Sequence, residues 1–324
     1  MSSRIAGFRA AEFVIPRRRP APQSGLMTWK KLVQLIREGF GQGHLHDYKP
    51  WLRVTKKDYS PSSFIGHLPS PGTGHKHHYR ANGERSMLLL LKWLGAIDTR
   101  DQYPAWPWAH NHAICGLPGT ELIRVRGLMD IANDLGVEHG LYVGTDVPYV
   151  ATIDILATWQ HADGNYYLTA HDCKPEELMR QDGDFSRLKQ RLALIHRYCE
   201  ESSIRYCLTH SERLSPELLR SLDVLHPLLT QDAMVALRQS HLYQTVVNAC
   251  MRRAYERPVH AVVTELATRL VLDFEACKQA LAAAIWFQDL DHDVSQPLET
   301  WHPLIPGGRK LRRELFASWV GAAR

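Results

Sequence analysis

Two triplets in this chain have the form acid-x-Lys, at residues 172–174 and 47–49. Such triplets arise by chance in chains of this length, so their surroundings must separate them. Asp47 lies among glycines with no strand before it, whereas Asp172 and Lys174 follow a run of β-branched and aromatic residues. At the end of a strand, alternation with a period of two places both side chains on one face of the sheet. The triplet at 172–174 is therefore the candidate for chemistry.

Two further acids are candidates for the same chemistry. Asp154 interrupts an apolar predicted strand, and Glu84 lies in the first turn of a predicted helix. A carboxylate in an apolar strand is costly to bury unless a partner pairs with it. Hydrolysis of a phosphodiester needs a divalent ion to activate water, and Mg²⁺ prefers carboxylate oxygens and waters. We therefore interpret Glu84, Asp154, Asp172 and Lys174 as the catalytic residues of a Mg²⁺-dependent endonuclease.

Each of these residues has an expected role. Asp154 and Asp172 would supply carboxylates to the metal, and the backbone carbonyl of Cys173 would add an oxygen. Lys174 would orient or deprotonate the attacking water and offset phosphate charge. Glu84 could hold a second ion about 4 Å from the first, so one Mg²⁺ or two are expected, with Mn²⁺ able to replace them. In the alternative, Asp154 and Lys174 form a buried ion pair, and Glu84 is an acid favoured by the helix dipole.

The elements that must position these residues alternate between helix and strand. The apolar periodicity predicts helices over residues 29–38, 83–94, 121–135 and 185–200. Runs of β-branched and aromatic residues predict strands over residues 97–103, 149–159, 166–173 and 204–208. Asp163-Gly164 stands between the second and third of these strands, and this dipeptide is a strong hairpin signal. The order is typical of an α/β fold.

The sequence beyond Ser211 has a helical character. Ser215-Pro216 begins one segment, and further helices are expected over 231–251, 264–270 and 274–290. Residues 291–298 could form a short β-wing, and two helices followed by a hairpin indicate a winged helix. A generic helical domain is the alternative. The predicted division is a flexible basic tail at 1–26, a nuclease domain at 27–211 and a winged-helix-like domain at 212–324.

Composition limits the class of protein. The 324 residues are 44% hydrophobic and 23% charged, as in globular proteins, and the net charge of +5 favours a polyanionic partner only weakly. The apolar stretch at 87–91 is far shorter than the roughly 20 residues a membrane helix needs, and no secretory signal accompanies Arg17–Arg19. A cytoplasmic location is expected. The six cysteines are scattered, and the histidines at 75–78 and 110–112 lack zinc-ligand spacing, so we interpret these histidines as solvated or facing phosphates.

Several stretches of the sequence resemble a known family. Residues 36–44 read IREGFGQGH and residues 47–52 read DYKPWL; the match resumes at 77–78 (HH), 97–104 (IDTRDQYP), 152–156 (TIDIL) and 171–175 (HDCKP). The Gly-Gln-Gly…Tyr-x-Pro-Trp string is the most distinctive part. Together, over about residues 29–210, these stretches resemble TnsA, the endonuclease subunit of heteromeric cut-and-paste transposases.

This resemblance implies a restriction-endonuclease-like core followed by a C-terminal winged-helix domain. It also implies that the chain, in a bacterial cytoplasm, cuts the non-transferred strand at the 5′ ends of a transposon. The family's acids and lysine fall on Glu84, Asp154, Asp172 and Lys174, although some relatives carry Gln at the position of Asp172. The implied partners are double-stranded DNA, a companion DDE-type transposase that cuts the 3′ ends, and an ATP-dependent regulator that binds the C-terminal part. No membrane partner is expected.

Basic and polar residues near the N-terminus would then contact DNA, mostly at phosphates. Besides Arg17–Arg19, the candidates are Arg37, Gln42, His44, Lys56, Lys57, Lys76 and Arg80. For each of these charges, a solvated surface position is the alternative. Two other functions also stay open: a restriction or junction-resolving nuclease with the same core, and a DNA-binding adaptor that has lost the chemistry. The complete set of acids and lysine argues against the adaptor.

Overall fold

The computed structural model describes residues 26–55, 58, 64–181 and 186–321. The predictions for the basic tail with Arg17–Arg19, and for Lys56 and Lys57, lie outside the described residues. Contacts divide the chain into two units. The first unit contains residues up to Leu68, His75–Glu84 and Ile97–His210, and the second contains Pro69–Gly74, Arg85–Ala96 and the residues from Ser211 on. The predicted domain boundaries at residues 26 and 211 stay a prediction.

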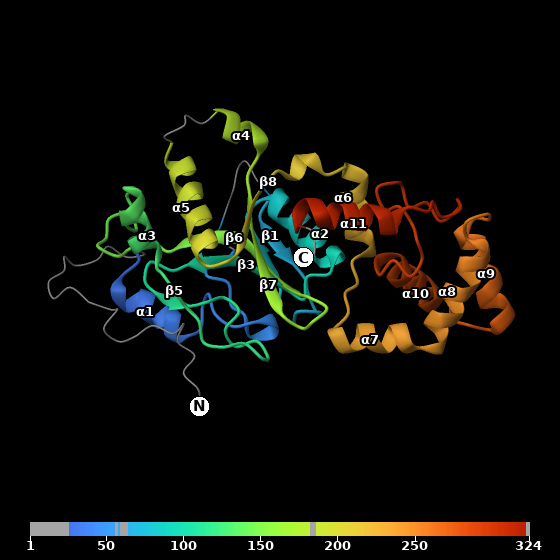
Figure 1. The fold of residues 1–324 in the computed structure, drawn as a ribbon. Helices are drawn as coiled ribbons and strands as arrows, with labels where there is room; N and C mark the ends of the chain where they lie inside the picture. Colours follow the sequence, from blue (N-terminus) through green and yellow to red (C-terminus); the bar gives the residue numbers. More distant parts are fainter. Residues whose placement is uncertain (1–25, 56–57, 59–63, 182–185, 322–324) are drawn as a thin grey trace. The chain divides into compact units, whose positions relative to one another are not determined.

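A four-stranded sheet organises the first unit (Figure 1). Its strands, in spatial order, are β3 (Asp98–Ala105), β6 (Ala151–Gln160), β7 (Tyr166–Cys173) and β8 (Arg205–Thr209). β3, β6 and β7 pair with antiparallel neighbours, whereas β8 runs parallel to β7. The predicted strands and the mixed α/β fold are confirmed. This architecture is consistent with a nuclease fold.

Helices pack on this sheet through two hydrophobic clusters. The larger cluster joins the sheet to α3 (Leu128–Leu135) and α5 (Arg187–Glu201), with buried side chains that include Leu128, Ile131, Leu194, Ile195 and Tyr198. The smaller cluster joins α1 (Trp29–Arg37) to the segments that flank β3 and β6, through Trp29, Leu32, Ile36, Trp106 and Val150. Burial of these faces explains why the periodic apolar residues formed helices.

Shorter elements complete the first unit. They are η2 (Leu45–Asp47), the antiparallel pair β1 (Gly66–Leu68) and β2 (His77–Tyr79), the pair β4 (His110–Asn111) and β5 (Arg124–Val125), and α4 (Glu176–Gln181). Helix α2 (Asn82–Leu94) begins in the first unit, and its residues from Arg85 on belong to the second. Glu84 therefore lies in the N-terminal part of α2, which belongs to the same unit as the sheet.

The predicted helix over residues 121–135 is only partly correct. Helix α3 begins at Leu128, and residues 124–125 form β5 instead. The backbone carbonyl of Ile123 accepts a hydrogen bond from the N–H of His112 at 2.7 Å, which extends the β4–β5 pairing. Long-range pairing thus replaces the local helical hydrogen bonds that the sequence pattern favours.

The second unit is helical. It contains η3 (Ser211–Arg213), α6 (Pro216–Leu225), α7 (Gln231–Gln239), α8 (His241–Arg253), α9 (Val259–Leu270), α10 (Phe274–Trp286) and α11 (Gly308–Trp319). Ser215 caps α6 and Asp273 caps α10 through their side-chain oxygens, as their sequence positions indicate. The apolar run Met87–Leu91 of α2 belongs to this unit and is buried.

The predicted β-wing at residues 291–298 is wrong, because residues 287–307 form no strand. Pro297, Pro303 and Pro306 lack the N–H that a strand ladder needs. The carboxylate of Asp293 instead accepts hydrogen bonds from the backbone N–H and the hydroxyl of Ser295, which closes a local turn. The winged helix is therefore not confirmed.

Two expectations from composition concern the whole chain. Among the helices of the described residues, none is both long and apolar enough to cross a membrane. The six cysteines are all free thiols, and Cys173, Cys199, Cys250 and Cys277 are buried. These four are therefore core residues, so the expectation that most of the scattered cysteines are small core residues is confirmed.

Candidate active site

The adjoining ends of β6 and β7 bring Asp154 and Asp172 together. The strand register pairs Leu156 with Ala170, so two residues further along Asp154 lies opposite Asp172 and on the same face. Oδ1 of Asp172 accepts a hydrogen bond from the backbone N–H of Asp154 at 3.2 Å. Oδ2 of Asp154 accepts one from the backbone N–H of Cys173 at 2.8 Å. The main chain of the facing strand thus orients each carboxylate.

Lys174 follows β7 directly and turns back toward the same carboxylates. Its Nζ donates to Oδ2 of Asp154 at 2.6 Å and to the carbonyl of Cys173 at 3.3 Å, and 22% of its side chain is exposed. Burial lowers the pKa of Lys174, but the negative charges of Asp154 and Asp172 outweigh this effect and raise the pKa above its ordinary value. The ion pair named as the alternative is thus present, within the same group of acids.

Glu84 joins this group from the N-terminus of α2. Its Oε2 accepts hydrogen bonds from the backbone N–H of Arg80 at 2.8 Å and from the side-chain amide of Gln102 at 3.1 Å. The side chain is buried, with 5% exposure. Burial, and then the negative charge of Asp154, raises the pKa of Glu84 to about 8. Glu84 and Asp154 therefore interact electrostatically.

Tyr206 on β8 is a member of the site that the sequence did not reveal. Its hydroxyl donates a hydrogen bond to Oδ2 of Asp172 at 2.9 Å. The pKa of Asp172 is nevertheless raised to about 6, first by burial and then by the charge of Asp154. The strand that carries Tyr206 was predicted, but its parallel pairing with β7 is a long-range feature that no local pattern indicates.

Gln102 on β3 was also missed. It has a left-handed backbone with φ of 49°, and it lies across from Asp154 in the β3–β6 register. Its side chain contacts Glu84 through Nε2, and its Oε1 accepts a hydrogen bond from the hydroxyl of Thr152 at 3.3 Å. Its carbonyl accepts the backbone N–H of Trp51 at 3.3 Å. Gln102 thereby connects the Tyr-x-Pro-Trp string to the acids.

The group carries more negative than positive charge in a buried place. Three buried carboxylates, Glu84, Asp154 and Asp172, face one ammonium, that of Lys174. Burial, and then the charge of Asp154, raises the pKa values of Glu84 and Asp172, so both carboxylates lack full stabilisation of their charged form. The donor set therefore suits a hard divalent cation. Among the described residues, however, these carboxylate oxygens do not all lie within 4.8 Å of one another, so they converge only loosely.

No model of a known protein family matches this chain. The chain is 25% identical over 250 residues to the Tn7 transposition protein TnsA of Escherichia coli, and the match covers 73% of this chain and 81% of that protein. The chain is TnsA-like. The resemblance stated from the short motifs is thus confirmed over most of the length of both proteins.

The DNA-contact candidates of this TnsA-like chain fall into two groups. Arg37, Lys76 and Arg80 are exposed. The side chain of Gln42 instead donates to the carbonyl of Ile36 at 2.6 Å, near the end of α1. Nε2 of His44 lies 3.0 Å from the carbonyl of Cys115. Gln42 and His44 are therefore engaged in contacts within the first unit.

The histidine clusters are not solvated as expected. His77, His78, His110 and His112 are all buried, so that interpretation is wrong for these four residues. Nδ1 of His77 lies 2.8 Å from Oδ1 of Asp101. Together with His75 they form a group whose ligand atoms lie within 4.8 Å of one another, which is close enough to hold a metal ion.

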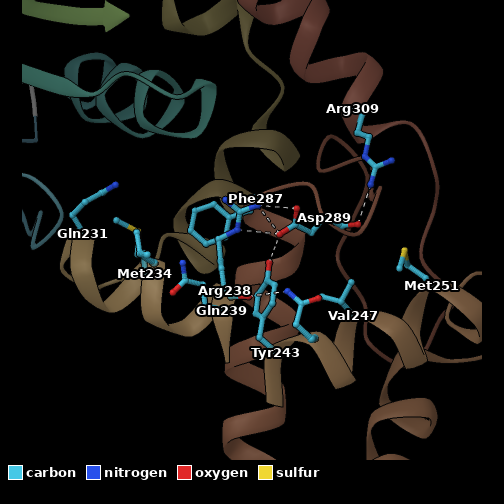
Figure 2. Close-up of a pocket in the computed structure, with 12 residues that line it drawn as sticks. Gln231, Met234, Arg238, Gln239, Tyr243, Val247, Met251, Phe287, Asp289 and Arg309 are labelled. Atoms are coloured by element: carbon cyan, nitrogen blue, oxygen red, sulfur yellow. Dashed lines mark hydrogen bonds and ion pairs between the residues drawn. The ribbon is translucent and has the colours of Figure 1, made fainter. Parts of the chain in front are cut away.

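A separate hollow of about 550 Å³ lies in the second unit (Figure 2). Its one acidic lining residue is Asp289, which pairs with Arg238 at 3.0 Å and accepts a hydrogen bond from the hydroxyl of Tyr243 at 2.5 Å. The guanidinium of Arg238 also lies over the ring of Phe287. Asp289 already forms an ion pair with Arg238, and the hollow has no second carboxylate that could hold a cation with it. The candidate active site therefore remains the group on β6, β7 and α2.

Proposed function

We propose that this TnsA-like chain is the DNA endonuclease subunit of a heteromeric cut-and-paste transposase, with a restriction-endonuclease-like core. It hydrolyses the non-transferred strand at the 5′ ends of the transposon. The observation that supports this function most strongly is that Glu84, Asp172 and Lys174 each interact with Asp154, in a chain that matches 81% of a transposition protein. The order of helix, antiparallel strands, helix and parallel strand supplies the scaffold.

Mg²⁺, with Mn²⁺ as a substitute, fits the donor atoms of the group. Asp154, Asp172 and the carbonyl of Cys173 would hold one ion, and Glu84 a second. When bound, the metal supplies an activated water and positive charge that stabilises the pentavalent phosphorane. Burial first, and then the negative charge of Asp154, raises the pKa values of Glu84 and Asp172, and a divalent cation bound beside them would stabilise both carboxylates in their charged form.

Lys174 acts as a protonated group in this proposal. Against the effect of burial, the charges of Asp154 and Asp172 raise its pKa in the metal-free protein, so the ammonium is charged there and donates hydrogen bonds. Its contact with Asp154 fixes Nζ beside the carboxylates, where it orients the water and offsets charge on the phosphate. Tyr206 and Gln102 are positioning residues, because they act through Asp172 and Glu84.

Arg37, Lys76 and Arg80 are the proposed phosphate contacts among the described residues, and Lys56 and Lys57 would extend them. Gln42 and His44 would contribute through the loop they stabilise. A companion DDE-type transposase would cut and join the 3′ ends. An ATP-dependent regulator would bind residues in the C-terminal part, which is helical. These partners rest on the similarity to TnsA.

A strand-specific nicking assay tests the proposal. Duplex DNA with a labelled transposon end is incubated with the chain, with and without the companion transposase, in Mg²⁺ or in chelator. The expected result is a nick at the 5′ end that requires both Mg²⁺ and the companion. Cleavage of branched or unrelated DNA without the companion would indicate a junction-resolving or restriction nuclease. Binding without any cleavage in the complete mixture would indicate an adaptor.

A further inference from the structure

A second group of metal-ligand side chains lies in the first unit, apart from the acids described above. His75 precedes β2, His77 lies on β2, and Asp101 lies on β3. Nε2 of His75 is 3.1 Å from Nδ1 of His77, and that atom is 2.8 Å from Oδ1 of Asp101. Nε2 of His75 and Oδ1 of Asp101 are 3.7 Å apart. Three ligand atoms thus face one another across a small triangle.

The size of this triangle matches a metal ion with imidazole ligands. A triangle with these sides has its corners about 1.9 Å from a common centre, whereas bonds from Zn²⁺ to His nitrogen and carboxylate oxygen are about 2.0–2.2 Å long. A point just outside the plane of the three atoms therefore satisfies all three bond lengths without any movement of the protein. An ion at that point would have its remaining coordination position on the side away from the three protein atoms.

Hydrogen bonds behind the ligand atoms direct the lone pair of His75 toward this point and are compatible with a lone pair on Nδ1 of His77. Nδ1 of His75 is 2.9 Å from the carbonyl of Leu45, which can only accept, so Nδ1 carries the proton and Nε2 has the lone pair. Nε2 of His77 lies 3.2 Å from the hydroxyl of Thr99, a partner that leaves Nδ1 able to act as a ligand. Such outer contacts are typical of metal-bound histidines.

The carboxylate of Asp101 is held in the same way. Its Oδ2 accepts the backbone N–H of His78 at 2.8 Å, which leaves Oδ1 directed at the two imidazoles. Asp101 and His77 are buried, and only 10% of the His75 side chain is exposed. A buried carboxylate thus lies beside two imidazole nitrogens, at 2.8 and 3.7 Å from its Oδ1.

We propose that His75, His77 and Asp101 bind one Zn²⁺ ion, with water in the fourth position. Two imidazole nitrogens favour a borderline transition ion over Mg²⁺, which prefers oxygen ligands only. The bound ion would tie β2 to β3 beside Gln102 and Arg80, the two groups that hold Glu84. Its role is therefore structural. The inference does not depend on the proposed nuclease function, because its ligands are separate from Glu84, Asp154 and Asp172.

Zinc binding to the full-length chain tests this inference without any DNA. The purified chain is stripped with chelator and dialysed against Zn²⁺ in excess Mg²⁺, which competes for the carboxylate group, and bound zinc is measured by elemental analysis. The variants are His75→Ala and Asp101→Asn. His46→Ala is the matched control, because His46 is exposed and belongs to the same region of the chain. Circular dichroism establishes that each variant is folded.

The wild type and His46→Ala should each bind about one Zn²⁺, and binding should raise the unfolding temperature of both. His75→Ala should bind Zn²⁺ about a hundredfold or more weakly, with little loss of fold, because it is the least buried ligand. If Asp101→Asn does not fold, the zinc content of His75→Ala alone tests the inference. The inference would be overturned if the wild type bound no Zn²⁺, or if His75→Ala bound Zn²⁺ as tightly as the wild type. It would also be overturned if the variant Asp154→Asn, at the other acidic group, lost the bound zinc while His75→Ala kept it.

Discussion

The carboxylate of Asp172 accepts a hydrogen bond from the backbone N–H of Asp154, and the carboxylate of Asp154 accepts one from the residue after Asp172. The two acids are thus fixed by the register of β6 and β7 and not only by their own rotamers. A slip of one residue in this pairing would send one carboxylate to the opposite face of the sheet. The hairpin at Asp163-Gly164, which sets the register, therefore also sets the geometry of the proposed metal site.

Lys174→Ala should remove nicking of the non-transferred strand while the companion transposase still joins the 3′ ends. The products of transposition should then be cointegrates instead of simple insertions, with nicking reduced by about a hundredfold or more. Lys49→Ala is the matched control, because Lys49 belongs to the other acid-x-Lys triplet and its Nζ contacts only the carbonyl of Glu38 among the hydrogen bonds described. Simple insertions made by Lys174→Ala at the normal rate would exclude this lysine from the reaction.

Tyr206→Phe should weaken Mg²⁺ binding and leave the fold intact. The hydroxyl orients Asp172 from outside the carboxylate pair, and loss of such a contact typically costs 10- to 100-fold in metal affinity, as a rough guide. The expected signature is a nicking rate that falls at low Mg²⁺ and recovers when Mg²⁺ is raised. Tyr166→Phe, on the same strand as Asp172, should leave the Mg²⁺ dependence unchanged. An identical Mg²⁺ dependence for Tyr206→Phe would show that the hydroxyl does not position Asp172.

Gly41→Ala should destabilise the first unit more than Gly39→Ala does. Both glycines have a left-handed backbone, with φ of 72° and 85°, so both variants incur about 1–2 kcal/mol of strain. A Cβ at Gly41 would also clash with Cγ of Pro104, whereas a Cβ at Gly39 would have no atom of the described residues within 4 Å apart from its own chain neighbours. Urea unfolding should therefore show a further loss of about 1–3 kcal/mol for Gly41→Ala. Equal losses for the two variants would mean that the loop moves away from Pro104 without cost.

His110 should make the free energy of unfolding depend on pH in mildly acidic solution. Burial lowers the pKa of His110 from 6.5 to about 4. Above pH 6.5 the imidazole is neutral in both states, so it contributes no pH dependence. Between the two values the unfolded chain takes up a proton that the folded chain excludes, and stability falls as pH falls, by up to about 1.4 kcal/mol per pH unit.

Urea unfolding at pH 7 and pH 5 measures this contribution. His110→Gln should lose less stability between the two pH values than the wild type does, because it lacks the group that titrates only when unfolded. His196→Gln, at an exposed position, should lose as much as the wild type. A His110→Gln variant with an unchanged pH dependence would show that His110 is protonated at pH 5 in the folded chain.

The local elements around the acids could be predicted because each has its own short-range signal. The apolar run after Glu84 and the alternating residues around Asp154 and Asp172 specify helix and strands, and Asp-Gly specifies the turn between β6 and β7. Three of the four proposed catalytic residues therefore needed only one hairpin to be brought together. The β-wing prediction is wrong because Pro297 within that segment, and Pro303 and Pro306 after it, cannot donate to a strand ladder.

The remaining parts of the site depend on contacts that no sequence window contains. Tyr206 reaches Asp172 only through the parallel pairing of β8, and Gln102 reaches Glu84 through an unusual left-handed backbone. The group of His75, His77 and Asp101 has ligands on two elements, and a spacing of 24 residues between His77 and Asp101 matches no short zinc motif. Such sites are defined by tertiary structure, so sequence spacing could not reveal them.

The most direct test of the central claim compares two acids of the β6–β7 hairpin in the nicking assay. Asp154→Asn removes the proposed metal ligand, whereas Asp163→Asn changes an exposed acid in the turn of the same hairpin. With Mg²⁺ and the companion transposase, Asp163→Asn should nick the 5′ end at the wild-type rate, and Asp154→Asn should be slower by about a hundredfold or more. Wild-type nicking by a folded Asp154→Asn variant would contradict the assignment of this group as the cutting site.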